Sequence, residues 1–148
     1  LMPANTSRWG LLSKMADLYA AHRLAGELTV LAFPPGELDV TDDMLFFSSL
    51  SSDLGEGPGQ TDGRYFRDDL LAIEWAVGVN GLSDPEACMT RLDEIVTVVD
   101  DVHANNRSLD GTVDDSWFTG IGDLQPIRSP DGFYLLGKLK TTVQIRLT

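Results

Sequence analysis

The alternation of apolar and polar residues between positions 68 and 79 is the clearest pattern in the chain. One face of an extended strand would carry Leu71, Ile73, Trp75, Val77 and Val79. The opposite face would carry Leu70, Ala72, Glu74, Ala76 and Gly78. Because both faces are largely apolar, the pattern predicts a central strand over Asp68–Val79 with cover on each side.

A helical period follows this strand. Its apolar positions are Cys88, Leu92, Ile95, Val96, Val99 and Val102. The other side carries Arg91, Asp93, Glu94, Asp100 and Asp101. Ser83 and Glu86 have the spacing of a capping box with Ser83 as the cap, and Pro85 suits the first turn because its missing N–H is not needed there. The pattern predicts an amphipathic helix lying on a sheet.

Shorter patterns predict the elements that come earlier. An apolar face at helical spacing over Ser7–Leu24 predicts a helix, which Thr6 or Ser7 can cap. The segments Leu28–Phe33 and Asp43–Leu50 are rich in apolar and aromatic residues, which predicts two strands.

The C-terminal part has the pattern of a hairpin. A strand over Trp117–Ile127 is broken by two glycines and Pro126, and the turn sequence Ser129–Gly132 joins it to a long, half-buried strand over Phe133–Leu147. We expect this last strand to lie at a sheet edge with unpaired backbone groups. After Asp131 the chain has no acidic residue and three cationic ones, namely Lys138, Lys140 and Arg146.

The segment Ser51–Gly63, SSDLGEGPGQTDG, is dense in glycine, serine and aspartate. It predicts a long flexible loop. The order of elements is then helix, two strands, loop, strand, helix and hairpin. It predicts an α+β fold, a mostly antiparallel sheet of about five strands with two main helices packed on it. The length of 148 residues indicates a single domain over residues 1–148.

The net charge of −12 narrows the possible partners. Binding to nucleic acid through phosphates needs clustered cations, and the 11 lysines and arginines are scattered. No apolar run has the length of a membrane span, and the opening LMPANTSRWG lacks the layout of a signal peptide. The negative charge therefore disfavours specific DNA binding. The shortness of the apolar runs disfavours insertion into a membrane.

Individual reactive side chains suggest no chemistry. Cys88 falls on the apolar helix face and is interpreted as a small buried residue. His22 is expected on a helix surface and His103 at a helix C-terminus, where the helix dipole favours a cation. Glu74 is expected to find a partner at an interface or a sheet end. We expect no catalytic residue, no metal ligand and no cofactor, and hence no enzyme.

Four segments carry a resemblance to a known family. They are RYFRDDLLAIEWAVGVNG, PEACMTRLDEIVTVVDDV, NRSLDGTV and GFYLLGKLKTTVQIRLT, in this order behind a leading helix and a strand pair. This arrangement resembles the tail terminator proteins of long-tailed, siphovirus-type bacteriophages. The resemblance implies a structural virion protein of the tail-neck region, assembled in the host cytoplasm. Its subunits would form a six-membered ring that caps the head-proximal end of the tail tube, stops tube polymerisation and joins the tail to the head connector. DNA would pass through the ring without specific binding.

Self-assembly makes charged residues the candidates for an interface. The cationic side of the last strand would pair with an acidic surface on a neighbouring copy. The candidates are Asp53, Glu56, Asp62, Arg64, Arg67, Asp93, Asp100, Asp101, Lys138, Lys140 and Arg146. Two alternatives stay open. One is a head-completion or connector-adaptor protein of the same neck, and the other is a small-molecule-binding regulatory α+β domain, which would need a concave apolar pocket.

Overall fold

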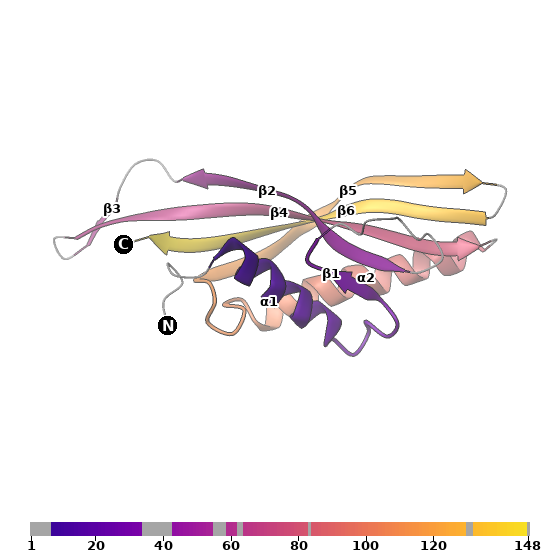
Figure 1. The fold of residues 1–148 in the computed structure, drawn as a ribbon, viewed down its shortest axis with the longest axis horizontal. Coiled ribbons are helices and arrows are strands. Elements are labelled where there is room, and N and C mark those ends of the chain that lie inside the picture. Colours follow the sequence, from indigo (N-terminus) through magenta and orange to yellow (C-terminus); the bar gives the residue numbers. More distant parts are fainter. Residues whose placement is uncertain are drawn as a thin grey trace.

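The computed structural model describes residues 7–33, 43–54, 59–61, 64–82, 84–129 and 132–147. The elements are α1 (Arg8–Ala20), β1 (Thr29–Leu31), β2 (Met44–Leu54), β3 (Gly59–Thr61), β4 (Arg64–Leu82), α2 (Pro85–Asn105), β5 (Asp115–Ser129) and β6 (Gly132–Leu147). They form a mixed, mostly antiparallel sheet with two helices packed on it, which confirms the predicted α+β class (Figure 1).

The last strand, β6, lies inside the sheet. The strand order is β1-β2-β4-β6-β5, with β3 paired to β4, so the expectation of an edge position for Phe133–Leu147 is wrong. β6 pairs with β4 along almost its whole length and with β5 on its other side. The outer position falls to β5, where the register is interrupted between Phe118 and Gly120 and again between Gly122 and Gln125. Such interruptions, together with Pro126, suit an edge strand because they hinder further pairing.

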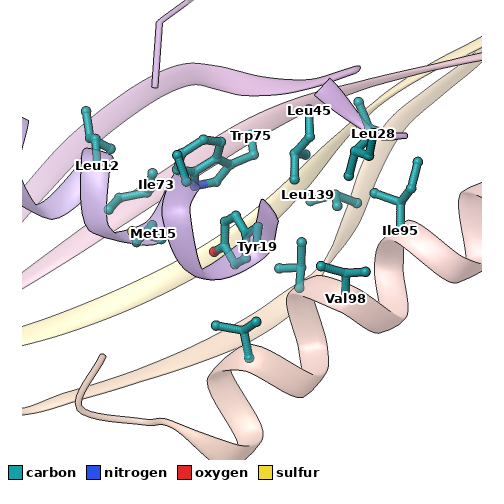
Figure 2. Close-up of a cluster of buried hydrophobic side chains, with 14 of the residues drawn as sticks. Leu12, Met15, Tyr19, Leu28, Leu45, Ile73, Trp75, Ile95, Val98 and Leu139 are labelled. Carbon is teal, nitrogen blue, oxygen red and sulfur yellow. The ribbon is translucent and has the colours of Figure 1, made fainter. Parts of the chain in front are cut away.

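Both helices pack on the same face of the sheet, as Figure 1 shows. Trp75 on β4 is fully buried there against Tyr19 of α1, with the two rings edge to face at a centroid distance of 5.3 Å (Figure 2). The predicted inward face of β4 is confirmed, since its five apolar residues are at most 2% exposed. The predicted cover on the second face is wrong, because Ala72 is exposed and Ala76 is half-buried. Alanine and glycine side chains present little apolar area, so leaving them in contact with water costs little.

Side-chain hydrogen bonds cap the N-termini of both helices. The Ser7 hydroxyl, one of the two predicted caps of α1, accepts a hydrogen bond from the N–H of Gly10 at 2.9 Å. The helix ends at Ala20, earlier than predicted. α2 is capped by Asp84, whose carboxylate accepts the N–H of Ala87 at 3.2 Å. The prediction of Ser83 as the cap is therefore wrong. Proline favours the first helical position, which makes the residue just before Pro85 the cap.

The predicted loop over Ser51–Gly63 is in part strand. Residues 51–54 continue β2 along β4, and Gly59–Thr61 form β3, which pairs with the start of β4. The prediction of a loop throughout is wrong because β4 is long enough to offer backbone partners to a segment of low strand propensity. The rest of the predicted loop, residues 55–58 and 62–63, lies outside the described residues.

Candidate interaction surface

The face of the sheet that points away from the helices is the candidate surface, and we call it the open face. Its residues alternate with the buried ones and meet across the strand pairs, because opposite residues of an antiparallel ladder share a face. The open face includes Phe46, Ser49 and Ser51 of β2, Leu70, Ala72, Glu74, Ala76 and Gly78 of β4, and Leu136, Lys138, Lys140 and Thr142 of β6. All of them are half-buried or exposed.

Glu74 lies at the centre of the open face. Its carboxylate accepts a hydrogen bond from the Ser49 hydroxyl at 3.3 Å and lies 3.8 Å from Nζ of Lys138. Glu74 therefore has partners as expected, but in the middle of the sheet, so the predicted place at an interface or a sheet end is wrong. The Lys138 side chain is 40% exposed, so this pair is screened by water and contributes little to stability.

Lys140 is the most accessible cation of the open face. It is exposed and follows Lys138 on the same side of β6. Its stem lies across Gly122 of β5, where an added Cβ would come within 2.9 Å of the lysine Cε. A glycine at this position therefore leaves room for the lysine to lie flat on the neighbouring strand. Among the described residues no ion pair forms with Lys140.

The second charged surface is the side of α2 that faces away from the sheet, which we call the outer face of α2. Glu86, Asp93 and Asp100 recur every seventh residue along it, and all three are exposed. Met89, on the same helix, is 42% exposed. Asp101, a candidate from the sequence, points elsewhere and lies 3.2 Å from Nε2 of His22. The outer face of α2 is thus acidic, with one apolar side chain beside it.

The two charged surfaces do not meet within one chain. α2 lies on the covered side of the sheet, whereas Lys138 and Lys140 belong to the open face. The pairing of these lysines with Asp93 and Asp100 would therefore need two copies of the chain.

Arg146, the third cation of β6, has a different setting. It is exposed, and its backbone N–H donates to the carboxylate of Asp114. Together with Asp114, Asp115 and Gln144 it lines a surface hollow of about 340 Å³. Arg107 forms a two-pronged ion pair with Asp115, with both N–O distances at 2.6 Å, and this pairing lowers the pKa of the Asp115 carboxyl. The hollow is charged and differs from the apolar pocket that the small-molecule alternative would need.

The remaining sequence candidates have no described side chains. Asp53, Arg64 and Arg67 lie on β2 and β4, where the backbone pairing is described but these side chains are not. Glu56 and Asp62 lie outside the described residues. Their part in an interface stays a prediction.

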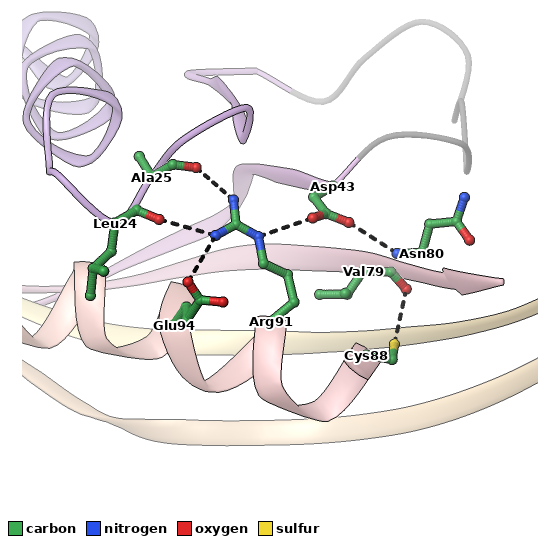
Figure 3. Close-up of polar contacts among 8 residues, drawn as sticks. All are labelled: Leu24, Ala25, Asp43, Val79, Asn80, Cys88, Arg91 and Glu94. Carbon is green, nitrogen blue, oxygen red and sulfur yellow. Dashed lines mark hydrogen bonds and ion pairs between the residues drawn. The ribbon is translucent and has the colours of Figure 1, made fainter. Parts of the chain in front are cut away.

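Arg91 organises a polar cluster that the sequence pattern placed on the helix surface. Its guanidinium donates to the carboxylate of Asp43 at 3.0 Å and to the carbonyls of Leu24 and Ala25 at 3.0 and 2.6 Å, and it lies 3.7 Å from Glu94 (Figure 3). Asp43 also accepts the backbone N–H of Asn80 at 3.2 Å. The cluster thereby ties α2 to the turn after α1 and to the first residue before β2, and its role is structural.

Both histidines differ in part from their predicted settings. His103 lies in the last turn of α2 as predicted, but it is 1% exposed and burial lowers its pKa from 6.5 to about 4, so it is not the cation that the helix dipole would favour. His22 follows the end of α1 and is half-buried, with Nδ1 accepting the N–H of Leu24 at 3.0 Å. Cys88 is buried as predicted, and burial raises its pKa.

Neither metal coordination nor a membrane span is indicated in the described part of the chain. It contains no group of three or more histidine, cysteine, aspartate or glutamate side chains that could hold a metal ion. No helix among the described residues is long and apolar enough to cross a membrane. Comparison of the sequence with protein-family models and with curated proteins gives no match.

Proposed function

We propose that this chain is a structural subunit of a bacteriophage tail, of the tail terminator type. Copies of it form a ring, with six members as the resemblance implies, on the head-proximal end of the tail tube. The ring stops polymerisation of the tube protein and offers its other side to the head connector, and DNA passes through its hole without specific binding. The proposal places the protein in the neck of the virion.

The open face of the sheet is the observation that carries this proposal. A sheet in a chain of this size buries one face and leaves the other to water or to a partner. Here the second face combines small apolar residues, Ala72 and Ala76, with half-buried Leu136 and two lysines. Together with Glu74 at its centre, this mixture of small apolar and charged side chains suits a surface that binds protein.

The order of the elements also supports the proposal. The resemblance rests on a leading helix, an early strand pair, a long strand, a helix and a final hairpin. The structure has α1, the pair β1 and β2, the 19-residue strand β4, the 21-residue helix α2, and the hairpin of β5 and β6. Three of the four segments quoted for the resemblance coincide with β4, α2 and β6, and the fourth, NRSLDGTV, forms the turn between α2 and β5.

Deletion of the gene from its source genome, followed by electron microscopy of the particles, tests the proposal. We expect tail tubes of excessive length without heads, next to separate heads, because nothing would stop the tube protein from polymerising. Tails of normal length beside leaking heads would instead assign the protein to head completion. Normal virions would contradict a neck function, and a screen of small molecules would then be the appropriate experiment.

A further inference from the structure

We propose that the boundary between α2 and the outermost strand β5 is a docking site for a basic amphipathic helix of another protein. The site combines apolar side chains with a row of carboxylates along one side. Its apolar members, which we call the α2–β5 strip, are Met89 and Val96 of α2 and Ile121 and Leu124 of β5. This docking site does not depend on the proposed function, because contacts and charges within the chain define it.

The β5 side of the strip lies on the face of the sheet that carries the helices. Ile121 pairs with Leu139, which is fully buried in the core, and opposite residues of an antiparallel ladder share a face. Leu124 lies over Gly137, where an added Cβ would come within 3.2 Å of the leucine Cδ1 and 3.6 Å of Cγ1 of Val77. Although both lie on this covered face, Ile121 and Leu124 are 43% and 39% exposed.

The α2 side of the strip faces β5. His103 shows this direction, since its Nδ1 lies 2.7 Å from the hydroxyl of Ser116 at the start of β5. Met89 and Val96 occupy every seventh position before His103, and positions seven apart lie almost in line along a helix. Both side chains therefore point to the β5 side of α2. Met89 is 42% exposed, and Val96 is half-buried.

The two sides of the strip are level with each other. From His103 back to Met89 the helix spans about 21 Å, and from Ser116 to Leu124 the sheet spans about 20 Å, counted along β6 because β5 has register shifts. α2 and β5 run in opposite directions from the contact of His103 with Ser116, as Figure 1 shows. Met89, Leu124 and Ile121 thus form one exposed apolar patch, and such patches mark sites of protein binding.

The outer face of α2 borders this patch with carboxylates. Glu86, Asp93 and Asp100 are exposed, and each precedes a residue of the row that ends at His103 by three positions. Residues three apart are neighbours on a helix surface, so the acidic row and the apolar row run side by side. Arg91, the one cation of α2, binds Asp43 on the opposite side of the helix. The margin of the strip on α2 is therefore acidic.

These features select a basic amphipathic helix as the occupant. An added strand would have to pair with β5, and the two register shifts and Pro126 prevent continuous pairing. A helix satisfies its own backbone hydrogen bonds and needs only a matching apolar side. The strip is as long as about 14 residues of helix. Cations seven residues apart would recur about every 10 Å, which is the interval of the carboxylates on α2.

The occupant belongs to a different protein. α1 buries its apolar face in the core through Leu11, Met15 and Tyr19, and α2 does so through Leu92 and Ile95. Neither helix of a second copy therefore has an apolar side free to lie on the strip.

Fluorescence anisotropy with a labelled synthetic helix tests the site. The probe is a peptide of about 14 residues, with leucines at helical spacing on one side, lysines seven residues apart beside them, and alanines elsewhere. One matched peptide has glutamates in place of the lysines, and another has the same composition in shuffled order. Circular dichroism measures the helix content that the probe gains on binding to the full chain.

A first pair of variants tests the apolar contact. Ile121→Thr shortens an exposed member of the strip and keeps a residue that favours strands. Ile127→Thr is the matched control, because Ile127 is also exposed on β5 but pairs with Tyr134 on the other side of the sheet. We expect Ile121→Thr to raise the dissociation constant of the lysine peptide at least about fivefold, and Ile127→Thr to leave it unchanged.

A second pair of variants tests the charges. The double variant Glu86→Lys with Asp93→Lys reverses two carboxylates of the row. Its control, Asp17→Lys with Glu27→Lys, makes the same change of net charge at exposed sites in α1 and the turn after it. We expect the first to weaken binding at least about tenfold more than the second, and high salt to weaken binding to the parent.

The glutamate peptide should bind at least about tenfold more weakly than the lysine peptide. No binding of the lysine peptide up to about 1 mM, equal binding of the three peptides, or equal effects of a variant and its control would each overturn the site. Binding without a gain of helix would overturn it too, since the occupant would then be an extended segment. Self-association of the parent that Ile121→Thr abolishes and the lysine peptide leaves intact would assign the strip to a second copy instead.

Discussion

The hydroxyl of Tyr19 lies 2.6 Å from Nε2 of His103, inside the interface between α1 and α2. On the other side of the imidazole, Nδ1 lies 2.7 Å from the hydroxyl of Ser116. That hydroxyl donates its one proton to the carbonyl of Arg107 at 2.8 Å, so it accepts a proton from Nδ1. Nε2 must then accept the proton of Tyr19. The buried histidine is therefore neutral, and both of its ring nitrogens have a hydrogen-bond partner.

This network predicts a loss of stability in mild acid. The pKa of His103 is about 4 in the folded chain, because burial disfavours the cation, and 6.5 ordinarily. Between pH 4 and pH 6.5 the unfolded chain binds more protons at this histidine than the folded chain does. The stability that follows from neutral His103 is therefore complete above pH 6.5 and is lost as the pH falls towards 4. The free energy of unfolding lost over this pH range amounts to about 3 kcal/mol.

Urea unfolding at pH 7 and pH 4 checks this for the parent and His103→Gln. Carboxylates titrate in both proteins, so the difference between their pH dependences isolates His103. We expect the parent to lose about 3 kcal/mol more than the variant over this interval. Equal losses would show that His103 is not held neutral.

Removing the hydroxyl of Tyr19 should also destabilise the fold. Tyr19→Phe leaves Nε2 of His103 without its donor in a buried site, which costs about 1–3 kcal/mol. Tyr134→Phe is the matched control, because Tyr134 is only half-buried and lies on the other side of the sheet. We expect it to stay within about 0.5 kcal/mol of the parent in thermal or urea unfolding. A similar cost for both variants would contradict the assigned hydrogen bond.

The sequence pattern predicted the elements better than their surroundings. The alternation in β4 marked its buried face because large apolar residues occupy it, but Ala72 and Ala76 gave the second face an apolar composition without the area that requires cover. His103 has the sequence position of a helix C-terminus, and its burial depends on Tyr19, which is 84 residues away. No local pattern contains that contact. Val98, fully buried on α2, was missed because the helical face is wider than the set of positions that defined it.

The candidate surface was also predicted only in part. The alternation of the last strand put Lys138 and Lys140 on one face, and the helical period put Asp93 and Asp100 on the side away from the apolar stripe. Both placements follow from periodicity alone. The central position of β6, in contrast, depends on which strands pair, and a single strand pattern does not encode its neighbours.

Arg91 is expected to contribute more to stability than any arginine on the surface. Arg91→Ala removes hydrogen bonds to Asp43 and to two backbone carbonyls, which leaves a half-buried carboxylate without its cation. We expect a loss of about 2–4 kcal/mol in the free energy of unfolding. Arg91→Lys should recover only part of it, because an ammonium cannot reproduce the planar fork of donors.

Arg23→Ala is the control for Arg91, since Arg23 is exposed in the turn after α1. Its loss should stay within about 0.5 kcal/mol. The interpretation of the Arg91 cluster is wrong if Arg91→Ala costs no more than Arg23→Ala in the same urea titration.

Cys88 should resist thiol reagents in the folded protein. Its side chain is 1% exposed, its thiol lies 3.5 Å from the carbonyl of Val79, and burial raises its pKa, so little thiolate is present and access is blocked. We expect labelling in native buffer to be slower than in urea by a factor of at least about 100. The rate of reaction with a chromogenic disulfide measures this, and comparable rates in the two conditions would mean that the N-terminal end of α2 opens readily.

The turn after α2 offers a test of backbone strain. Leu109, Asp110 and Gly111 all have positive φ, at 50°, 59° and 82°, and Asn106 supports the turn by accepting the N–H of Asp110 at 2.9 Å. An added Cβ at Gly111 would meet nothing within 4 Å, so any cost of substitution comes from the backbone conformation. Gly111→Ala should therefore cost about 1 kcal/mol, and Gly111→Asn less, because asparagine tolerates the left-handed region better than alanine. Urea unfolding of the two variants measures the difference. Equal costs would mean that the turn relaxes to negative φ, since alanine and asparagine differ at this open site mainly in their tolerance of the left-handed region.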